Sequence, residues 1–315
     1  MATHHLEPTP ETVTQFFSPA TPAVLTVDPG DTLVVRTLDA RGHLARPDRR
    51  TSDAPKMFNP RRGHCLAGPI AVRGAEPGLT LAVHLRSVRP AAWGFTEAGA
   101  HRTDLNERLG VAGGPTAFLV WDLNPHHLTG AWGRVTTSLA PFLGVIGMPP
   151  AEPGEYSTEP PRAFGGGNID CRELVAGSTL YLPITVPGAM LCVGDGHATQ
   201  GDGEVSGTAI ECGMTSELEI SLVTDPPLPS IHATTPAGKV TFGFSPDLNE
   251  AMTAALGAMV TWLTLLLEVD RPTALALASV AVSLRVTQVV NGTWGVHALL
   301  PEGALGRAAQ PGQRG

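Results

Sequence analysis

The chain has 315 residues, of which 42% are hydrophobic and 16% are charged, so it can bury a substantial core and is not typical of a disordered protein. Its formal net charge of −8 argues against nucleic acid as a partner, because nucleic-acid-binding proteins usually present a basic surface. The first residues lack the basic and apolar pattern of a secretory signal, and the four cysteines show no C-x-x-C spacing. We therefore expect a cytoplasmic protein with reduced thiols.

Glycine and proline recur at short intervals in the first two-thirds of the chain, which is typical of many short strands joined by turns. A phrase of turn residue, Gly, polar residue, Thr and Leu begins at Pro29, Pro77 and Ala176, with Leu79 replacing the polar residue in the second copy. Each copy predicts a tight turn that starts a strand; shared turn chemistry and true duplication both explain the repetition. We expect a mainly β fold in sandwich-like or barrel-like layers.

Residues 89–165 show a less regular pattern. Prolines at 149, 150 and 153 and the pair Pro160–Pro161 indicate a long surface loop that ends shortly before Asp170. Long loops in compact domains are often lids or channels, so this loop is a candidate roof for a site near Asp170.

The composition changes after Pro229, where the pattern becomes helical. Ser245 followed by Pro246 suits a helix start with proline at the first position. The pattern predicts one helix over 246–268 and a second over 272–283. A strand over 284–290 follows them, so the expected fold class is mainly β with a C-terminal helix pair, an α+β arrangement.

Residues 251–267 carry no charge, but the run is shorter than the about 20 residues of a membrane span. This favours a buried or subunit-interface helix, and we expect a homo-oligomer, a dimer or higher, without membrane attachment. The expected organisation is a flexible N-terminus (1–20), a β-rich domain carrying the site (21–229), a C-terminal α-containing part packed on the same unit (230–302) and a disordered tail (303–315).

Residues 194–204 hold four side chains that can bind metals in a run that is otherwise mostly glycine: Asp195, His197, Asp202 and Glu204. Asp195 and His197 are two residues apart, so in an extended chain they point to the same face about 7 Å apart. A carboxylate and an imidazole at that separation can converge on one cation, and the glycines let the backbone fold closely around it.

Several phrases surround this segment. They are Gly-Gly-Gly-Asn-Ile-Asp-Cys-Arg-Glu-Leu at 165–174, Gly-Ser-Thr-Leu-Tyr-Leu-Pro at 177–183, Val-Ser-Gly-Thr-Ala-Ile-Glu at 205–211 and Val-Val-Asn-Gly-Thr-Trp-Gly-Val-His at 289–297. Together with the stretch 68–78 they resemble the acetamidase/formamidase family, in order from about Pro22 to Pro301. The resemblance implies a mostly β fold, a divalent metal, and hydrolysis of short aliphatic amides or of related small amides such as lactams.

The expected metal ligands are Asp170, Asp195 and His197, with a fourth position open to water or substrate and zinc as the expected ion. The family pattern supports Asp170 as a ligand. By itself, this residue is equally well explained as a turn carboxylate that caps a backbone N–H. For His197 the alternative is a hydrogen-bonded core histidine. The number of acids also permits a second ion bound by oxygen ligands, such as calcium.

Glu204 is the expected proton shuttle, because a carboxylic acid near the reacting group can move a proton between water and the leaving nitrogen. Asp202 is expected to bind the His197 ring and so orient it, an arrangement that is common around metal-bound imidazoles. The alternative for both is an ordinary turn acid. His64 matches a family position and is expected to be a fourth ligand or a substrate hydrogen-bond donor. Asp39 also matches the family and either faces the site or caps a turn.

These residues, together with what the family resemblance implies, predict a metal-dependent amidohydrolase that cleaves formamide or acetamide with a metal-activated water. A bound cation lowers the pKa of water to about 7 and polarises the carbonyl oxygen. The alternatives are hydrolysis of a lactam or cyclic amide on the same fold, and a non-catalytic metal-containing protein that binds a small ligand. A serine nucleophile is disfavoured because no G-x-S-x-G motif occurs, and Cys192 lies in an apolar run that is typical of an inert thiol.

Overall fold

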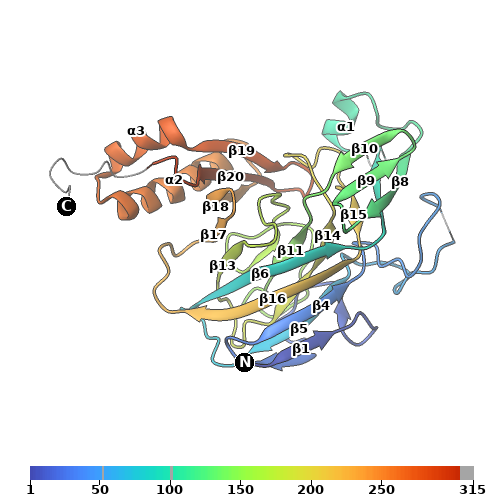
Figure 1. The fold of residues 1–315 in the computed structure, drawn as a ribbon, viewed down its shortest axis with the longest axis horizontal. Helices are drawn as coiled ribbons and strands as arrows, with labels where there is room; N and C mark the ends of the chain where they lie inside the picture. The colour runs from blue at the N-terminus through green and yellow to red at the C-terminus, as the bar shows by residue number, and fades with distance from the viewer. Residues whose placement is uncertain (52, 100–101, 306–315) are drawn as a thin grey trace.

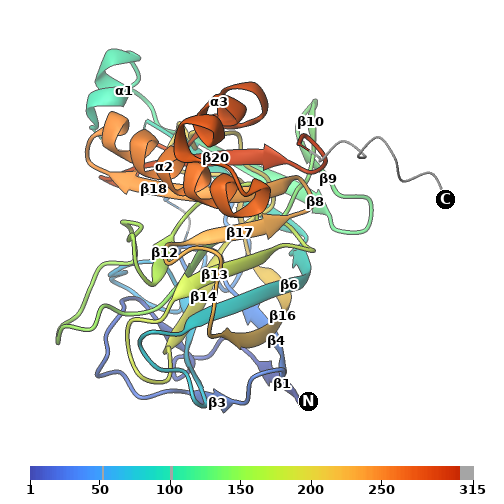
Figure 2. The ribbon, with the colours of Figure 1, turned by 90° about the vertical axis from the view of Figure 1, so that its left-hand side faces the viewer.

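Two large β-sheets hold most of the strands in the computed structural model, which describes residues 1–51, 53–99 and 102–305 (Figures 1 and 2). In spatial order, the first sheet consists of β1 (Thr3–Leu6), β4 (Thr32–Thr37), β16 (Met214–Val223), β6 (Thr80–Pro90), β13 (Thr179–Pro183), β17 (His232–Thr235), β18 (Gly238–Ser245), β20 (Trp294–Pro301) and β19 (Ser283–Gln288). The strands from the C-terminal part therefore continue the sheet that the earlier strands begin. The predicted mainly β fold with a C-terminal helix pair is confirmed.

The second sheet carries the buried strands that matter for function. Its order is β10 (Val135–Ser138), β9 (Thr129–Trp132), β8 (Ala117–Asn124), β7 (Trp93–Ala98), β15 (Glu211–Cys212), β14 (Leu191–His197), β11 (Phe142–Gly147) and β12 (Gly166–Asn168). Strand β5 (Leu66–Val72) also pairs with β14 and carries β2 (Val13–Thr14) and β3 (Leu25–Val27). Several of these strands fall in 89–165, so that region is more regular than its sequence suggests. Its proline-rich end is a loop between β11 and β12, as predicted.

The core joins the two sheets. Alternate residues of β16 are buried, as expected for a strand with one face on the core. One cluster of buried side chains contains Leu85 and Leu218 from the first sheet and Ile146 and Val193 from the second. Strands β11 and β14 differ from β16, because every residue in them is buried. These two adjacent strands thus lie in the interior of the molecule.

The three copies of the repeated phrase start three strands of the first sheet, as predicted. Strands β4, β6 and β13 begin at Thr32, Thr80 and Thr179, each two residues after a glycine of the phrase. These glycines have φ angles of 90° to 99°, in the left-handed region where a side chain would be strained. The turn therefore requires glycine at this position, which explains the recurrence without any appeal to duplication.

The N-terminal segment differs from the flexible segment expected over residues 1–20. Strand β1 pairs in parallel with β4, and β2 pairs with β5. Asp31 holds β1 in place, because its carboxylate accepts a hydrogen bond from the Ala2 N–H (2.6 Å) and lies 2.8 Å from His4 Nε2. The sequence gives β1 only four residues and one buried side chain, Leu6, so its alternation is too short to recognise.

The C-terminal helices are α2 (Leu248–Leu267) and α3 (Arg271–Ala281), close to the predicted spans; a short α1 (Asp104–Arg108) lies between β7 and β8. The first helix begins later than Ser245 because Asp247 caps it, accepting bonds from the next turn's backbone. By length and composition alone α2 could cross a membrane. One of its faces is buried, however, and Gly243 of β18 lets the backbone of α2 approach closely at Ala251.

The outer faces of the helix pair leave large apolar side chains exposed, including Leu265, Leu275 and Val280. This agrees with the expectation of a homo-oligomer, which stays a prediction. Of the tail expected over 303–315, residues 306–315 lie outside the described residues.

The Asp31 contacts generate a prediction about pH. Hydrogen bonds from the Ala2 N–H, His4 and the Asp28 N–H lower the pKa of Asp31 to about 2. Because the folded pKa lies below the unfolded value of about 4, this stabilisation is present above about pH 4 and is lost as the pH falls toward 2. Asp31→Asn should reduce the free energy of unfolding at pH 7, and the difference from wild type should shrink between about pH 4 and pH 2. Urea unfolding over this range measures it.

Asp28→Asn is the matched control, because the Asp28 carboxylate forms an ion pair with the exposed Arg73 and the loss should be small at every pH. A pH-independent difference between wild type and Asp31→Asn would contradict this role of the carboxylate.

Candidate metal centre

Asp195 and His197 lie on the fully buried strand β14, with 2% and 1% of their surface exposed. Burying charged or polar groups costs free energy unless they are paired or bind a ligand. A strand whose other members are glycine and apolar residues has no structural need for them. Their position in the interior therefore indicates a functional site.

The structure brings the three predicted ligands together. Asp170 follows β12 in a left-handed conformation (φ 52°), and its N–H donates to the carbonyl of Gly144 on the neighbouring β11. Ligand atoms of Asp170, Asp195 and His197 all lie within 4.8 Å of one another. Their convergence agrees with the sequence analysis, and their role as ligands stays a prediction.

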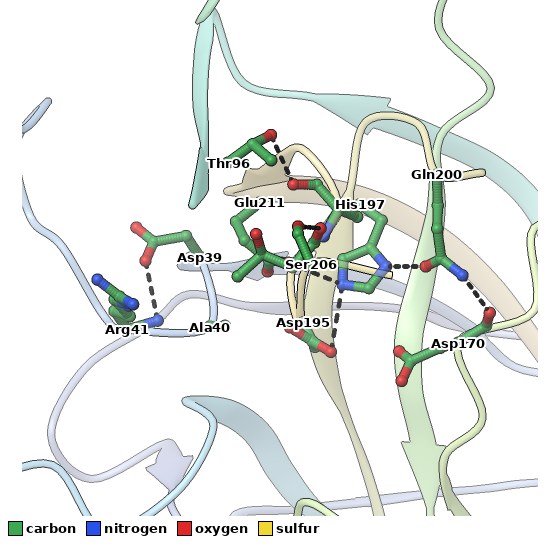
Figure 3. A network of polar contacts seen from close by, with 12 residues as sticks. Asp39, Ala40, Arg41, Thr96, Asp170, Asp195, His197, Gln200, Ser206 and Glu211 are labelled. Atoms are coloured by element: carbon green, nitrogen blue, oxygen red, sulfur yellow. Dashed lines mark hydrogen bonds and ion pairs between the residues drawn. The ribbon is translucent and has the colours of Figure 1, made fainter. Parts of the chain in front are cut away.

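Gln200 fixes the orientation of the His197 ring (Figure 3). His197 Nδ1 lies 2.9 Å from Gln200 Oε1, and Gln200 Nε2 donates to the carbonyl of Asp170 at 2.7 Å. Since an amide oxygen only accepts, Nδ1 carries a proton and the neutral ring keeps a lone pair on Nε2. Gln200 thus leaves His197 Nε2 ready to bind a cation.

Three independent features show that the residues of this site suit a metal ion. Among the described residues, the buried atoms Asp170 Oδ1 and His197 Nε2 have no hydrogen-bond partner. Buried polar atoms are normally satisfied, so these two point to a missing ligand. Gly144 supplies the space, because a Cβ there would lie 2.6 Å from carboxylate oxygens of both Asp170 and Asp195. Two carboxylates and an imidazole form a donor set that zinc accepts.

Glu211 is a site residue that the sequence analysis missed. It lies directly opposite His197 in the antiparallel pair of β14 and β15, and its Oε1 is 3.3 Å from His197 Nε2. The other oxygen, Oε2, is buried without a partner in the part of the chain that the structure describes. The available signal was its place at the end of the phrase 205–211, one of the phrases that carry the family resemblance.

Glu204, the predicted proton shuttle, lies in the same region. It is buried, follows Gly203 in a turn and has a left-handed conformation (φ 44°). Its carboxylate, that of Glu211 and the His197 ring form a second group within 4.8 Å. The site therefore holds two carboxylates beside the expected ligands.

Burial raises the pKa of Asp170 and of Glu211 to about 7. Burial and the neighbouring Asp170 carboxylate raise the pKa of Glu204 well above its ordinary range. Several carboxylates confined in the interior cannot all be ionised without protons or a cation to offset their charge. Negative charge at this site is thus in excess.

Within the centre, His197 Nε2 lies 3.4 Å from Asp195 Oδ2 and 3.3 Å from Glu211 Oε1, which are its two ion-pair contacts among the described residues. Burial opposes the charge of Asp195, but the His64 and His197 rings outweigh it and hold its pKa below the ordinary range. Burial also opposes a charged His197, yet Glu211 and Asp195 raise its pKa well above the ordinary value. A bound cation would replace the proton that this arrangement attracts to His197.

Asp202 does not lie where the sequence analysis expected it. Its side chain is exposed and faces Arg285, 3.7 Å away, and the residue that bonds His197 is Gln200. The turn at 201–203 directs Asp202 outward and Glu204 inward, because glycine on both sides lets the chain reverse. Asp202 instead forms a separate group with Glu173 and His297.

Asp39 is buried but serves a turn. It accepts hydrogen bonds from the Arg41 and His43 N–H groups and contacts His43 Nδ1 at 3.0 Å. In Figure 3 it lies apart from the His197 ring and turns toward Arg41. His64 lies just before β5, and Asp195 is the charged group that changes the pKa of His64 most. It is not a member of the three-ligand group.

The hairpin of β19 and β20 closes the site from the C-terminal part of the chain. Asn291 Nδ2 donates to Asp170 Oδ2 at 2.6 Å, over a separation of 121 residues. The carbonyl of Thr287 accepts from the Gly203 N–H, and Gly203 in turn accepts from the Val289 N–H. The hairpin thus holds both Asp170 and the turn that carries Glu204.

Comparisons with known proteins show what the chain is similar to. Residues 2–153 and 151–301 match the model of the Acetamidase/Formamidase family. The acetamidase of Mycolicibacterium smegmatis is 26% identical over 272 residues (65% of this chain, 64% of the relative), and the formamidase of Methylophilus methylotrophus is 26% identical over 258 residues (66% and 63%). The chain spans less than two thirds of the length of these relatives. The crystal structure of an acetamidase from Bacillus halodurans superposes with a TM-score of 0.84 at 25% identity, over 95% of this chain and 97% of that one.

Gly144→Ala should remove metal binding, because the new Cβ would occupy the space between Asp170 and Asp195. Elemental analysis of the purified variant should find metal reduced at least about tenfold, while circular dichroism should show the same β content. Gly201→Ala is the matched control, since its Cβ would meet nothing within 4 Å. Full metal content in Gly144→Ala would show that the cation lies elsewhere.

Proposed function

The chain belongs to the acetamidase/formamidase family, and on that premise we propose that it hydrolyses short aliphatic amides such as formamide and acetamide to a carboxylate and ammonia. The observation that carries the proposal is the buried group of Asp170, Asp195 and His197, in which two ligand atoms make no hydrogen bond to any described residue and surround the space left by Gly144. This group lies beside two further carboxylates, which supplies the residue types that amide hydrolysis needs.

Asp170, Asp195 and His197 would hold the cation, and zinc is the proposed ion because these nitrogen and oxygen donors suit it. When bound, such a cation lowers the pKa of water and polarises a carbonyl oxygen. Gln200 orients the His197 ring, and Asn291 orients the Asp170 carboxylate. Residues of this kind around the ligands typically change metal affinity or activity 10- to 100-fold when they are replaced, so both are part of the proposed centre.

Glu204 and Glu211 would manage the proton. In the proposed reaction a carboxylate takes a proton from the attacking water, and the C–N bond breaks as that proton reaches the leaving nitrogen. Glu204 is assigned this role because it lines the cavity and lies beside His197, and a raised pKa makes its ionised carboxylate a stronger proton acceptor than an ordinary one. Glu211 keeps Oε1 on the Ala209 N–H, at 2.9 Å, and on His197, so it is better placed to fix the centre than to move.

The substrate would enter through a cavity of about 500 Å³ beside the 199–210 segment. Gln200 and Glu204 line this cavity and also belong to or contact the ligand group. Trp121 and Ile210 give it apolar walls, which suit the alkyl part of a small amide. The cavity is larger than formamide requires. We therefore expect the residues of its walls to limit the size of the acyl group of the substrate.

A cysteine nucleophile is not favoured by the structure. All four cysteines are free and buried. Burial raises the pKa of Cys192 to about 12 and raises that of Cys171 further. A reactive cysteine needs a lowered pKa and access to substrate, and neither of these thiols has them.

Two variants separate metal binding from proton transfer. His197→Ala should lose bound metal and ammonia release together, because it removes a ligand from the centre. Glu204→Gln should keep metal and lower kcat by about 10²- to 10⁴-fold, the range typical of general acid–base catalysis. Ammonia release from formamide and acetamide, with elemental analysis of the same samples, measures both.

Glu211→Gln is the comparison that distinguishes the two carboxylates, and it should lower metal content more than Glu204→Gln does. Retained ammonia release by metal-free His197→Ala would overturn the proposed mechanism. Metal-loaded wild-type protein that releases no ammonia from either amide would show that the substrate is a larger or cyclic amide, or that the protein only binds a ligand.

A further inference from the structure

His64 lies beside the metal centre without joining the ligand group. It lies just before β5, whose residue Leu66 pairs with Gly194 on β14. Among charged groups, Asp195 has the largest effect on the pKa of His64, so the two side chains are near each other. His64 as a whole residue is half-buried.

The Nδ1 edge of the His64 ring is held by Thr158. Thr158 Oγ1 accepts a hydrogen bond from the His64 backbone N–H at 2.9 Å and lies 2.9 Å from His64 Nδ1. Thr158 is completely buried. Gly63 permits this approach, because a Cβ there would lie 2.8 Å from Thr158 Oγ1 and would collide with the carbonyl of Gln15.

The hydrogen bonds of the Thr158 hydroxyl determine the tautomer of His64. The Thr158 hydroxyl has one proton, and a buried hydroxyl proton needs an acceptor. In the described part of the chain its hydrogen bonds are with the His64 N–H, which can only donate, and with His64 Nδ1. Nδ1 must then accept, which places the proton of the neutral imidazole on Nε2. Burial lowers the pKa of His64 and so favours this neutral ring.

We propose that Thr158 is a positioning residue that keeps His64 protonated at Nε2, so that the Nε2–H donates a hydrogen bond to the carbonyl oxygen of the amide substrate. The proposal rests on the proposed function. It makes His64 a catalytic residue that stabilises the negative charge that develops on this oxygen. It also excludes Nε2 of His64 as a metal ligand, because an imidazole nitrogen must be unprotonated to bind a metal.

The loop between β11 and β12 is built to hold Thr158 rigidly. Phe17 and Tyr156 exchange two backbone hydrogen bonds, of 2.9 and 2.8 Å, which fasten the loop to the N-terminal segment. The Arg162 guanidinium lies over the Phe17 ring, 5.3 Å from its centre, and donates to the carbonyl of Ser157 at 2.6 Å. The proline-rich loop thus acts on the site through Thr158.

Thr158→Val tests the proposal, because valine keeps the shape of threonine and removes the hydroxyl. We expect unchanged metal content, little change in KM and a kcat for acetamide that falls about 10- to 100-fold, somewhat less than for loss of a donor in an oxyanion site. Thr158→Ser should restore kcat to near the wild-type value. His64→Ala should also keep its metal, and His64→Gln, whose amide can still donate, should retain more activity than His64→Ala.

A tautomer measurement is independent of activity. The ¹⁵N shifts of the His64 ring, assigned by difference from His64→Ala, should show a proton on Nε2 in the metal-loaded wild type and loss of this preference in Thr158→Val. A proton on Nδ1, or loss of metal in His64→Ala, would overturn the proposal by making His64 a ligand. Equal kcat in Thr158→Val and wild type would also overturn it. If wild type released no ammonia, the proposed function would fail, whereas the ring shifts would still decide the tautomer.

Discussion

An excess of negative charge buried between the sheets is the constraint on which the site depends. Asp170, Asp195, Glu204 and Glu211 surround one imidazole, and all five groups are buried. A folded protein tolerates such a group only if protons or a cation offset the charge. Raised carboxyl pKa values are the response of the protein alone, and a divalent ion between Asp170, Asp195 and His197 offsets the same charge without protonating the ligands.

The fold meets this constraint by bringing distant segments to the end of one buried strand. Strand β14 supplies two side chains, β12 leads to Asp170, and β15 places Glu211 opposite His197. The C-terminal hairpin then locks the arrangement through Asn291. Because the hairpin also pairs with β18, on which α2 packs, the helix pair supports the site indirectly. The helical C-terminal part is thereby connected to the site through one shared sheet.

The sequence predicted the parts of the site that depend on local spacing. The separation of two residues between Asp195 and His197 places both on one face of a strand, and the glycines around them permit close packing. The repeated turn phrase predicted three strand starts for the same reason, since glycine φ angles are a local property. Glu211, Gln200 and Asn291 could not be predicted in this way, because their roles depend on cross-strand register and on contacts over long sequence separations. Asp202 was assigned the role of Gln200 because an acid is the more common partner of a ligand histidine, and the direction of a glycine turn is not visible in the sequence.

Metal analysis of the purified protein, with ammonia release from formamide and acetamide before and after chelation, tests the central claim most directly. The account predicts close to one tightly bound divalent ion per chain, turnover that chelation abolishes, and recovery when zinc is added back. Full ammonia release from metal-free protein would contradict it, because the buried carboxylates and His197 would then carry out the reaction with protons alone.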